Sequence, residues 1–212
     1  DLCMQTGIRV LTLPNVRDIP VSGLGRVALR EVEISDLLSR EEKSLDLNQM
    51  GYVTGKRILV TGGGGSIGSE LVRQLLPAKP AQIVLFDIYE NTTYELYHDI
   101  IKDAREQGTD IQVYIGSITH IPAITKVFEK YHPQVVFHAA AHKHVPLMEH
   151  NACEAIENNV FGTLNVVKLA DKYNCSHFVQ ISTDKAVNPA NVMGATKRMD
   201  EMIVQYYAAN SK

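Results

Sequence analysis

Cysteine is scarce in this sequence, and its spacing excludes two kinds of site. The three cysteines, Cys3, Cys153 and Cys175, are odd in number and lie far apart among 212 residues. No CxxC pair and no Cys/His cluster has the spacing of metal ligands, so we expect no metal site. The set also does not resemble a disulfide framework, and reduced thiols in a cytosolic compartment are the simplest interpretation.

The sequence also lacks an excess of one charge sign and a long apolar run. Lys and Arg number 21 against 24 Asp and Glu, a net charge of -3, which provides no basic field for nucleic acid or acidic lipid. No apolar run reaches the length of a membrane span, and no signal peptide opens the sequence. With 45% hydrophobic and 21% charged residues, the composition is that of an ordinary globular protein with one good core.

From Lys56 onward, short apolar runs alternate with amphipathic stretches of helical length. The expected strands are Arg57–Val60, Gln82–Phe86, Ile111–Ile115, Gln134–His138 and His177–Ile181. The expected helices are Ser66–Leu76, Thr92–Gln107, Ile121–Tyr131, Ala152–Tyr173 and Gly194–Ala209. Near-continuous apolar strands separated by helices are typical of a parallel sheet covered on both faces. We therefore predict an α/β fold, a Rossmann-like doubly wound parallel sheet with right-handed crossovers and helices on both faces.

Residues 1–55 have a different pattern and too little apolar surface to fold alone. Short strand-like runs occur at Ile8–Leu13 and Gly25–Glu33, and Ser35 could cap a short helix over Ser35–Arg40. We interpret 1–55 as the tail of a preceding domain plus a linker, followed by a domain over 56–212. Because the chain begins at Asp1 and stops on a polar Ser211-Lys212, we expect it to be cut from a longer protein.

A glycine-rich loop at Gly62–Gly68 is the strongest local signal. Gly62, Gly65 and Gly68 have GxxGxxG spacing, directly after an expected strand and at the start of an expected helix that includes Ser66 and Ile67. Such glycines permit a tight turn and close approach of backbone amides to a pyrophosphate, which the positive end of the helix also attracts. No GK[ST] follows the glycines, which disfavours a P-loop nucleotidase.

Asp87 ends the second expected strand, about 20 residues after the glycines. A carboxylate there accepts hydrogen bonds from the adenosine ribose hydroxyls and repels a 2′-phosphate. No arginine follows Asp87 directly, so we expect NAD rather than NADP as the cofactor. The alternative is that Asp87 only caps a loop.

Four motifs together resemble the extended short-chain dehydrogenases/reductases that act on nucleotide sugars. They resemble most the capsule and exopolysaccharide type, which is UDP-N-acetylglucosamine 4,6-dehydratase-like. The motifs are Thr61-Gly-x-x-Gly-x-x-Gly68, the run from His138 to Glu149 (HAAAHKHVPLME), Asn158-Asn-Val-Phe-Gly-Thr163, and Ile181-Ser-Thr-Asp-Lys-Ala-Val-Asn-Pro189. The resemblance covers about residues 56–212. The segment Arg30–Arg40 is similar to the one that precedes the catalytic domain of long, membrane-anchored members.

The resemblance implies a reaction and assigns roles in it. A 4,6-dehydratase removes hydride from C4 of the sugar, eliminates water across C5–C6 and returns the hydride to C6 with bound NAD. Asp184 would be the general acid at C6, Lys185 the base at C5, and Thr183 would hold the C4 hydroxyl beside Ser182 in the substrate site. Asp184 would need a raised pKa, which a closed, dry site could provide. Position alone leaves a catalytic pair and an exposed ion pair in a loop equally open.

Met193 and Lys197 occupy the positions of the YxxxK pair of short-chain dehydrogenases. Their i, i+4 spacing places both on one helical face, and Lys197 would anchor the nicotinamide ribose. Methionine has no titratable proton, so the C4 base would be Thr183, Asp184, Lys185 or an ordered water. Long membrane-anchored members also carry methionine at this position. The plain alternative for Met193 is a core filler.

The resemblance also implies contacts from the segment after the fourth strand. Ala139 and Ala140 would contact the cofactor, while Lys143 and His144 would line the substrate site. Asn159 would hold backbone near the cofactor. Two histidines of this region have other interpretations. His142 is either a site residue or an ordinary surface histidine, and we expect His138 to be a packed strand residue.

Two other functions remain open from the sequence. A nucleotide-sugar 4-epimerase shares the cofactor site but normally keeps the tyrosine that Met193 replaces. A non-catalytic NAD-binding sensor or scaffold is favoured by the same replacement and disfavoured by Thr183, Asp184, Lys185 and Lys197. Ser117 departs from the family, which often has Asp after the glycine at 116. We expect a cytoplasmic domain of an inner-membrane-anchored bacterial protein, truncated before its C-terminal substrate region and able to form a homo-oligomer.

Overall fold

The computed structural model describes residues 11–12, 30–31 and 50–211 of the chain. The chain divides into two compact units, Asp1–Leu45 and Asp46–Lys212. In the first unit, β1 (Leu11–Thr12) pairs with β2 (Arg30–Glu31) in an antiparallel arrangement. These two short strands lie inside the two strand-like runs expected there, while the helix expected at Ser35–Arg40 lies outside the described residues.

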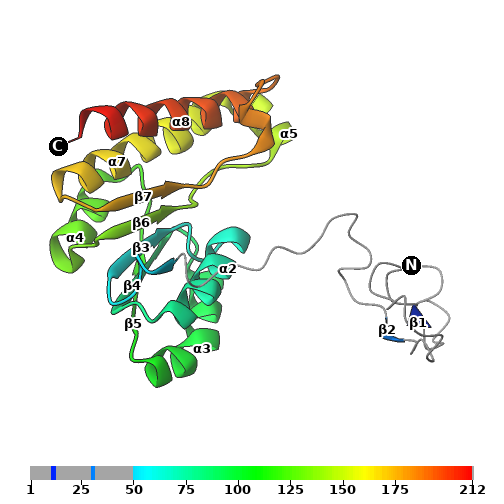
Figure 1. Ribbon diagram of the computed structural model, residues 1–212. Helices are drawn as coiled ribbons and strands as arrows, with labels where there is room; N and C mark the ends of the chain where they lie inside the picture. The colour runs from blue at the N-terminus through cyan, green and yellow to red at the C-terminus, as the bar shows by residue number, and fades with distance from the viewer. Residues whose placement is uncertain (1–10, 13–29, 32–49, 212) are drawn as a thin grey trace, which may run out of the picture. The chain divides into compact units, whose positions relative to one another are not determined.

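The second unit contains a parallel sheet of the predicted doubly wound type (Figure 1). Its order is β5-β4-β3-β6-β7, so the chain adds strands on one side of β3 and then crosses to the other side at β6. The strands are β3 (Arg57–Thr61), β4 (Gln82–Asp87), β5 (Asp110–Ile115), β6 (Val135–His138) and β7 (His177–Gln180). This change of direction beside β3 is the point where such sheets place ligands, beyond the carboxyl ends of the strands.

Helices connect the strands, within a few residues of the expected bounds except in the region after β6. They are α2 (Ser66–Leu75), the 3-10 turn η4 (Leu76–Ala78), α3 (Glu90–Gln107), α4 (Ile121–Tyr131), α5 (Val145–His150), α6 (Ala152–Ala155), the π-helical η5 (Ile156–Phe161), α7 (Gly162–Lys172), the 3-10 turn η6 (Asp184–Ala186) and α8 (Val192–Asn210).

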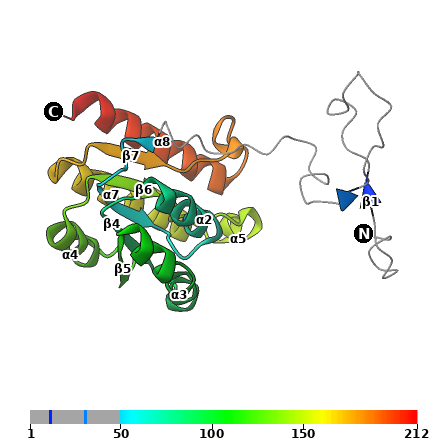
Figure 2. The ribbon, with the colours of Figure 1, turned by 60° about the horizontal axis from the view of Figure 1, so that its bottom comes forward.

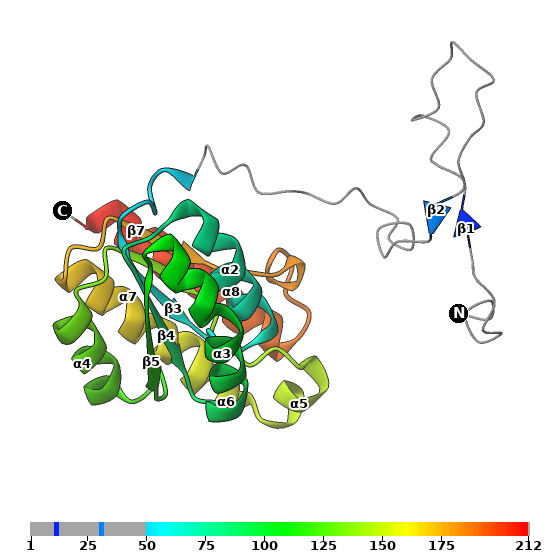
Figure 3. The same ribbon diagram turned by 90° about the horizontal axis from the view of Figure 1, so that it is seen from below.

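The three central strands, β4, β3 and β6, are buried on both faces, which explains their apolar side chains. Side chains from alternate positions of β3, such as Ile58 and Val60, pack with α2 and α3, whereas Leu59 packs with α4 and α7. Figure 3 shows these two helix layers on opposite sides of the strands. Helix α8 lies alongside α7, as Figures 1 and 2 show, and so extends the second layer beyond β7.

The expected helix Ala152–Tyr173 is wrong as one uninterrupted α-helix. The segment is divided into α6, η5 and α7, and the wider turn η5 contains Asn158 and Asn159. Asparagine side chains compete for backbone groups, and Asn159 directs its amide to the backbone of His142 rather than to solvent. Wider turns of this kind occur often at functional sites.

The segment just before Lys56, which the sequence analysis assigned to the linker, packs against the sheet. Met50 and Val53 are buried in the same hydrophobic cluster as β3 and α2, and the ring of Tyr52 lies 4.9 Å from that of His177. Residues 50–55 thus add apolar side chains to the core of the second unit, and the N–H of Gly55 donates a hydrogen bond to the carbonyl oxygen of Lys79. None of the helices in the described part of the chain is both long and apolar enough to cross a membrane.

Candidate active site

At two glycines of the loop between β3 and α2, an added side chain would collide with backbone atoms. Gly62 has a φ of +69°, and a Cβ on it would stand 2.6 Å from the backbone nitrogen of Ala140. A Cβ on Gly68 would stand 2.0 Å from the carbonyl oxygen of Gly62. The loop therefore packs closely against the segment after β6 on one side and against the first turn of α2 on the other. The positive φ of Gly62 agrees with the tight turn that the GxxGxxG spacing predicts.

Helix α2 presents an open N-terminus at this loop. Gly65 is its N-cap, and within the described residues no side chain caps the helix and no acidic residue lies in its first turn. The first amide groups and the positive end of the helix are therefore available to an anion. The arrangement suits a pyrophosphate better than a cation.

Asp87 lies at the carboxyl end of β4, next to the loop. Its Oδ2 accepts a hydrogen bond of 2.8 Å from the backbone N–H of Gly64, and its Oδ1 accepts one of 2.9 Å from Tyr89. The carboxylate thus ties the glycine loop to the end of the strand, as the loop-cap alternative requires. It also lines a cavity, and each carboxylate oxygen can accept a further hydrogen bond. Both interpretations of Asp87 are compatible with this geometry.

The first cavity, of about 340 Å³, lies beyond the carboxyl ends of β4, β5 and β6. It is lined by Gly62, Phe86, Asp87, Ile88, Gly116, Ser117, Ile118, Thr119, Ala140, His142, Glu154, Glu157 and Asn158. Apolar walls from Phe86 and Ile118 beside polar groups suit a flat heterocycle with hydrogen-bonding edges. Glu154, in α6, and Glu157, in η5, line the cavity but were not among the expected site residues, because the wide turn at η5 is not visible in the sequence.

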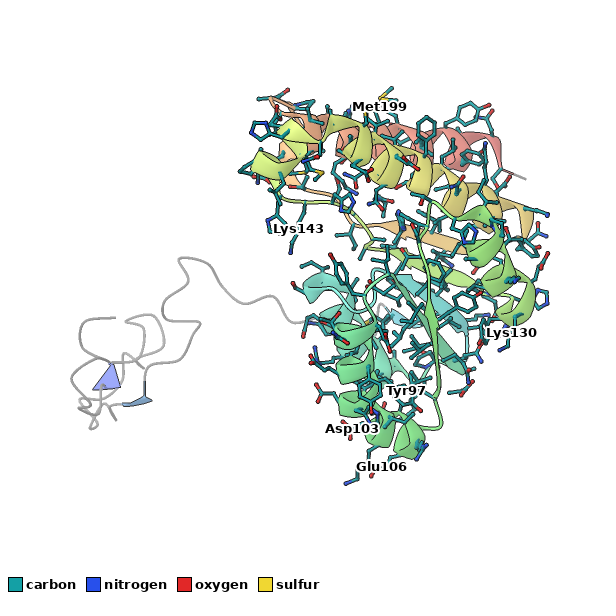
Figure 4. The ribbon with its side chains drawn as sticks, turned by 180° about the vertical axis from the view of Figure 1, so that it is seen from behind. Tyr97, Asp103, Glu106, Lys130, Lys143 and Met199 are labelled. Atoms are coloured by element: carbon teal, nitrogen blue, oxygen red, sulfur yellow. The ribbon has the colours of Figure 1, made fainter. Side chains whose placement is uncertain are left out.

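The second cavity, of about 300 Å³, lies beyond β6 and β7. It is lined by Ile67, Ala139, Ala141, His142, Lys143, Ile181, Ser182, Thr183, Lys185, Met193 and Lys197. His142 lines both cavities, so the two adjoin at the segment after β6. In Figure 4, Lys143 points from this segment toward the side of α2. His144, in contrast, is exposed at the start of α5 and lines neither cavity.

Asn159 fixes the segment that separates the two cavities. Its Oδ1 accepts from the backbone N–H of His142 at 2.8 Å, and its Nδ2 donates to the His142 carbonyl oxygen at 3.1 Å. Nδ2 also lies 2.9 Å from the hydroxyl of Thr196 in α8. The side chain is fully buried, so these bonds hold the backbone in place.

The run Ser182–Lys185 follows β7 at the mouth of the second cavity. Thr183 and Lys185 line the cavity, while the Asp184 side chain is 85% exposed and does not. The Thr183 hydroxyl donates to Asp184 Oδ1 at 2.9 Å, and Lys185 Nζ lies 3.2 Å from the same oxygen. These two hydrogen bonds, that of Thr183 first, lower the pKa of Asp184. In this structure Asp184 therefore lacks the raised pKa that a general acid requires.

Met193 and Lys197 lie on one face of α8, as their spacing predicts. Both are buried, and both line the second cavity. Met193 packs with Met148 and Ala155, so it fills the core as well as the cavity wall. Lys197 Nζ donates to the carboxylate of Asp200 at 2.9 Å. Asp200 was missed by the sequence analysis, although its i+3 position after Lys197 was a usable signal.

His138 is a packed strand residue, as expected. Its ring is fully buried between the hydroxyls of Thr61 and Thr163, with Nε2 2.9 Å from the Thr163 oxygen. Burial lowers its pKa to about 3, with a smaller contribution from the charge of Lys197, so the ring is neutral. Within the described residues, no group of three or more His, Cys, Asp or Glu side chains could hold a metal ion.

Comparison with known proteins decides the family. A family model described as "Polysaccharide biosynthesis protein" matches residues 58–212, which is well over half of the chain. The chain belongs to this family. Sugar-nucleotide dehydratases and epimerases are among the proteins similar to this polysaccharide biosynthesis chain.

Two curated relatives and one solved structure illustrate the range of this family likeness. The "Capsular polysaccharide biosynthesis protein CapD" of Staphylococcus aureus is 44% identical over 205 residues, which are 96% of this chain and 34% of CapD. A "UDP-N-acetylglucosamine 4,6-dehydratase (inverting)" of Campylobacter jejuni is 32% identical over 158 residues, 74% of this chain and 44% of the enzyme. The crystal structure of Pen from Bacillus thuringiensis has a TM-score of 0.68 and 31% identity over 76% of this chain and 50% of Pen. The chain thus spans about a third to a half of the length of these proteins.

Proposed function

We propose that this chain is the NAD-binding part of a nucleotide-sugar 4,6-dehydratase that acts on UDP-N-acetylglucosamine or a similar sugar nucleotide. The observation that carries the proposal is the pair of adjoining cavities along the carboxyl ends of β4 to β7. One cavity is flanked by the glycine loop and Asp87, and the other contains Thr183, Lys185 and Lys197. The similarity to a 4,6-dehydratase at 32% identity supports the same function.

The residues of the first cavity fit a dinucleotide. The loop at Gly62 and Gly68 excludes side chains where the pyrophosphate would lie, and the open end of α2 supplies amide groups. Asp87 would hold the adenosine ribose, and its carboxylate would repel the 2′-phosphate of NADP. Ile67 and Ala139 would contact the nicotinamide side from the second cavity. When bound, the cofactor would accept hydride from the sugar and return it.

The residues in and beside the second cavity would perform the proton transfers. Thr183 would hold the C4 hydroxyl, whose proton would pass to Thr183, Asp184, Lys185 or an ordered water as the hydride leaves C4. Lys185 would then remove the proton at C5. Asp184 would then donate a proton to the hydroxyl that leaves C6. Because Asp184 is exposed and its pKa is lowered, this role requires the bound substrate to displace water and to take the Thr183 hydroxyl away from the carboxylate.

The full-length natural protein that contains this chain, incubated with UDP-N-acetylglucosamine, is expected to release a UDP-linked 4-keto-6-deoxy sugar. Replacing Lys185 with methionine should lower kcat by about 100-fold or more, within the range that general base catalysis contributes, with cofactor affinity unchanged. Lys130→Met, which removes an exposed lysine of α4, serves as the matched control (Figure 4). The measurement is product identification by mass spectrometry and NMR, with initial rates for each variant.

The products also separate the rival functions. UDP-N-acetylgalactosamine would indicate a 4-epimerase, and firm NAD binding without turnover by the full-length protein would indicate a sensor or scaffold. We expect the 212-residue chain alone to bind NAD but to turn over little, because it spans only about a third to a half of the length of its relatives. The membrane anchor and the homo-oligomer expected of the longer protein belong to the same proposal.

A further inference from the structure

Helix α8 carries a buried ion pair behind the second cavity. Lys197 Nζ lies 2.9 Å from Asp200 Oδ2, and the two side chains are only 6% and 0% exposed. Met199, between them in the sequence, points to the outer side of the helix (Figure 4). A buried pair pays a desolvation cost that its mutual attraction often only offsets, so such a pair is weak evidence for a stabilising role. Because the pair lies at a cavity, it can act on a molecule bound there.

Lys197 has no other buried counter-charge among the described residues that surround it. The neighbouring buried groups are uncharged: Thr163 from α7 lies beside the Asp200 carboxylate, and the neutral His138 follows it toward the sheet. Glu201, one helical turn after Lys197, is partly exposed; its carboxylate accepts hydrogen bonds from Ser182 and Arg198, and the charge of Lys197 makes only a small contribution to its lowered pKa, after these two hydrogen bonds. The charge of the Lys197 ammonium is therefore cancelled mainly by Asp200.

Lys197 also lines the second cavity, with Met193 one turn before it. A methionine at 193 offers no hydroxyl that could share the ammonium or carry a compensating negative charge. A molecule bound in the cavity would therefore experience the net charge of the Lys197–Asp200 pair. With both partners ionised, the pair presents no net charge.

We propose that Asp200 is a positioning residue that holds and neutralises Lys197, so that the second cavity favours the oxidised form of the dinucleotide. This inference rests on the proposed cofactor site. The oxidised nicotinamide ring carries a positive charge, and the reduced ring carries none. An uncompensated ammonium in the cavity wall would therefore repel the oxidised ring and leave the reduced ring almost unaffected. A dehydratase that recycles its cofactor begins each cycle with the oxidised form, so neutralising Lys197 would help the site to retain that form.

The test is to measure the dissociation constants of NAD⁺ and NADH separately for the 212-residue chain and its variants. Asp200→Asn keeps the shape and removes the charge, and should weaken NAD⁺ relative to NADH by about tenfold or more, an order of magnitude typical of one like charge in a partly desolvated site. This ratio reports the redox potential of the bound cofactor, which a purely structural role of Asp200 would not change. Asp103→Asn, an exposed aspartate of α3, is the control that removes the same charge elsewhere (Figure 4).

Two further variants keep the test decisive if Asp200→Asn folds poorly. Asp200→Glu retains the charge and should keep the wild-type ratio, and the double variant Lys197→Met with Asp200→Asn removes both charges and should restore it. A ratio that is unchanged in folded Asp200→Asn, or that stays altered in the double variant, would overturn the inference. If the unmodified chain binds neither form, the proposed cofactor site itself is wrong; binding of both forms with no effect of Asp200 would refute only the inference.

Discussion

Replacing Gly68 with alanine is expected to abolish measurable NAD binding and to destabilise the domain. The added Cβ would stand 2.0 Å from the Gly62 carbonyl oxygen, 2.7 Å from its carbonyl carbon and 2.9 Å from Gly63 Cα. All three are backbone atoms, so no side chain can move aside, and the whole loop must shift away from α2. Overpacking of this kind typically costs about 1–3 kcal/mol. Isothermal titration calorimetry with NAD measures the loss of affinity, and urea unfolding measures the loss of stability.

Two other glycines provide matched controls for this substitution. A Cβ on Gly65 would lie 3.3 Å from the same carbonyl oxygen, so Gly65→Ala should have a smaller effect. Gly51 has no atom within 4 Å of an added Cβ, and Gly51→Ala should leave NAD affinity unchanged. Wild-type affinity in Gly68→Ala would show that the pyrophosphate does not lie at this loop.

The second large effect concerns stability in acid, which His138 and Asp200 control in opposite directions. Burial keeps the pKa of His138 at about 3 in the folded protein, against 6.5 when unfolded, so acidification protonates the unfolded chain first and lowers stability. Burial also raises the pKa of Asp200 from 3.8 to about 6, despite the opposing charge of Lys197. The folded protein then takes up a proton that the unfolded chain does not, which raises stability as the pH falls through 6 toward 3.8.

These opposite slopes largely offset each other over most of this range in the unmodified protein. Asp200→Asn removes the compensating uptake and leaves the loss due to His138, so between pH 7 and pH 4 it should lose about 2 kcal/mol more stability than the unmodified chain does. Urea unfolding at several pH values measures this difference, with Asp103→Asn as the control. Parallel losses in the two proteins would mean that folded Asp200 takes up no proton in this range.

The sheet and its glycine loop could be predicted from sequence because their determinants are local. Apolar runs such as Gln82–Phe86 are typical of strands covered on both faces, and the glycine spacing specifies the turn before α2 whatever packs around it. The same holds for Met193 and Lys197, whose common face follows from helical periodicity. For this reason the predicted elements agree with the structure within a few residues, except between α5 and α7.

The remaining features depend on contacts between distant segments. The wide turn η5 brings Glu157 to the first cavity, where Glu154 of α6 also lies, and it contains an asparagine that binds backbone 17 residues away. The exposure of Asp184 and the burial of Asp200 are decided by neighbouring elements, not by residue type. A sequence shows that both are aspartates, whereas only the fold shows that the pKa of one is lowered and that of the other is raised.

The central claim is that a dinucleotide lies over the amides beginning at Gly62 with its adenosine ribose held by Asp87. Parallel titration of the chain with NAD and NADP tests it most directly, with Asp87→Ala as the altered protein and Asp103→Asn as its control. We predict binding of NAD, at least tenfold weaker binding of NADP because the Asp87 carboxylate repels the 2′-phosphate, and loss of this preference in Asp87→Ala. A folded chain without affinity for NAD, or one that binds both dinucleotides equally well, would contradict the claim.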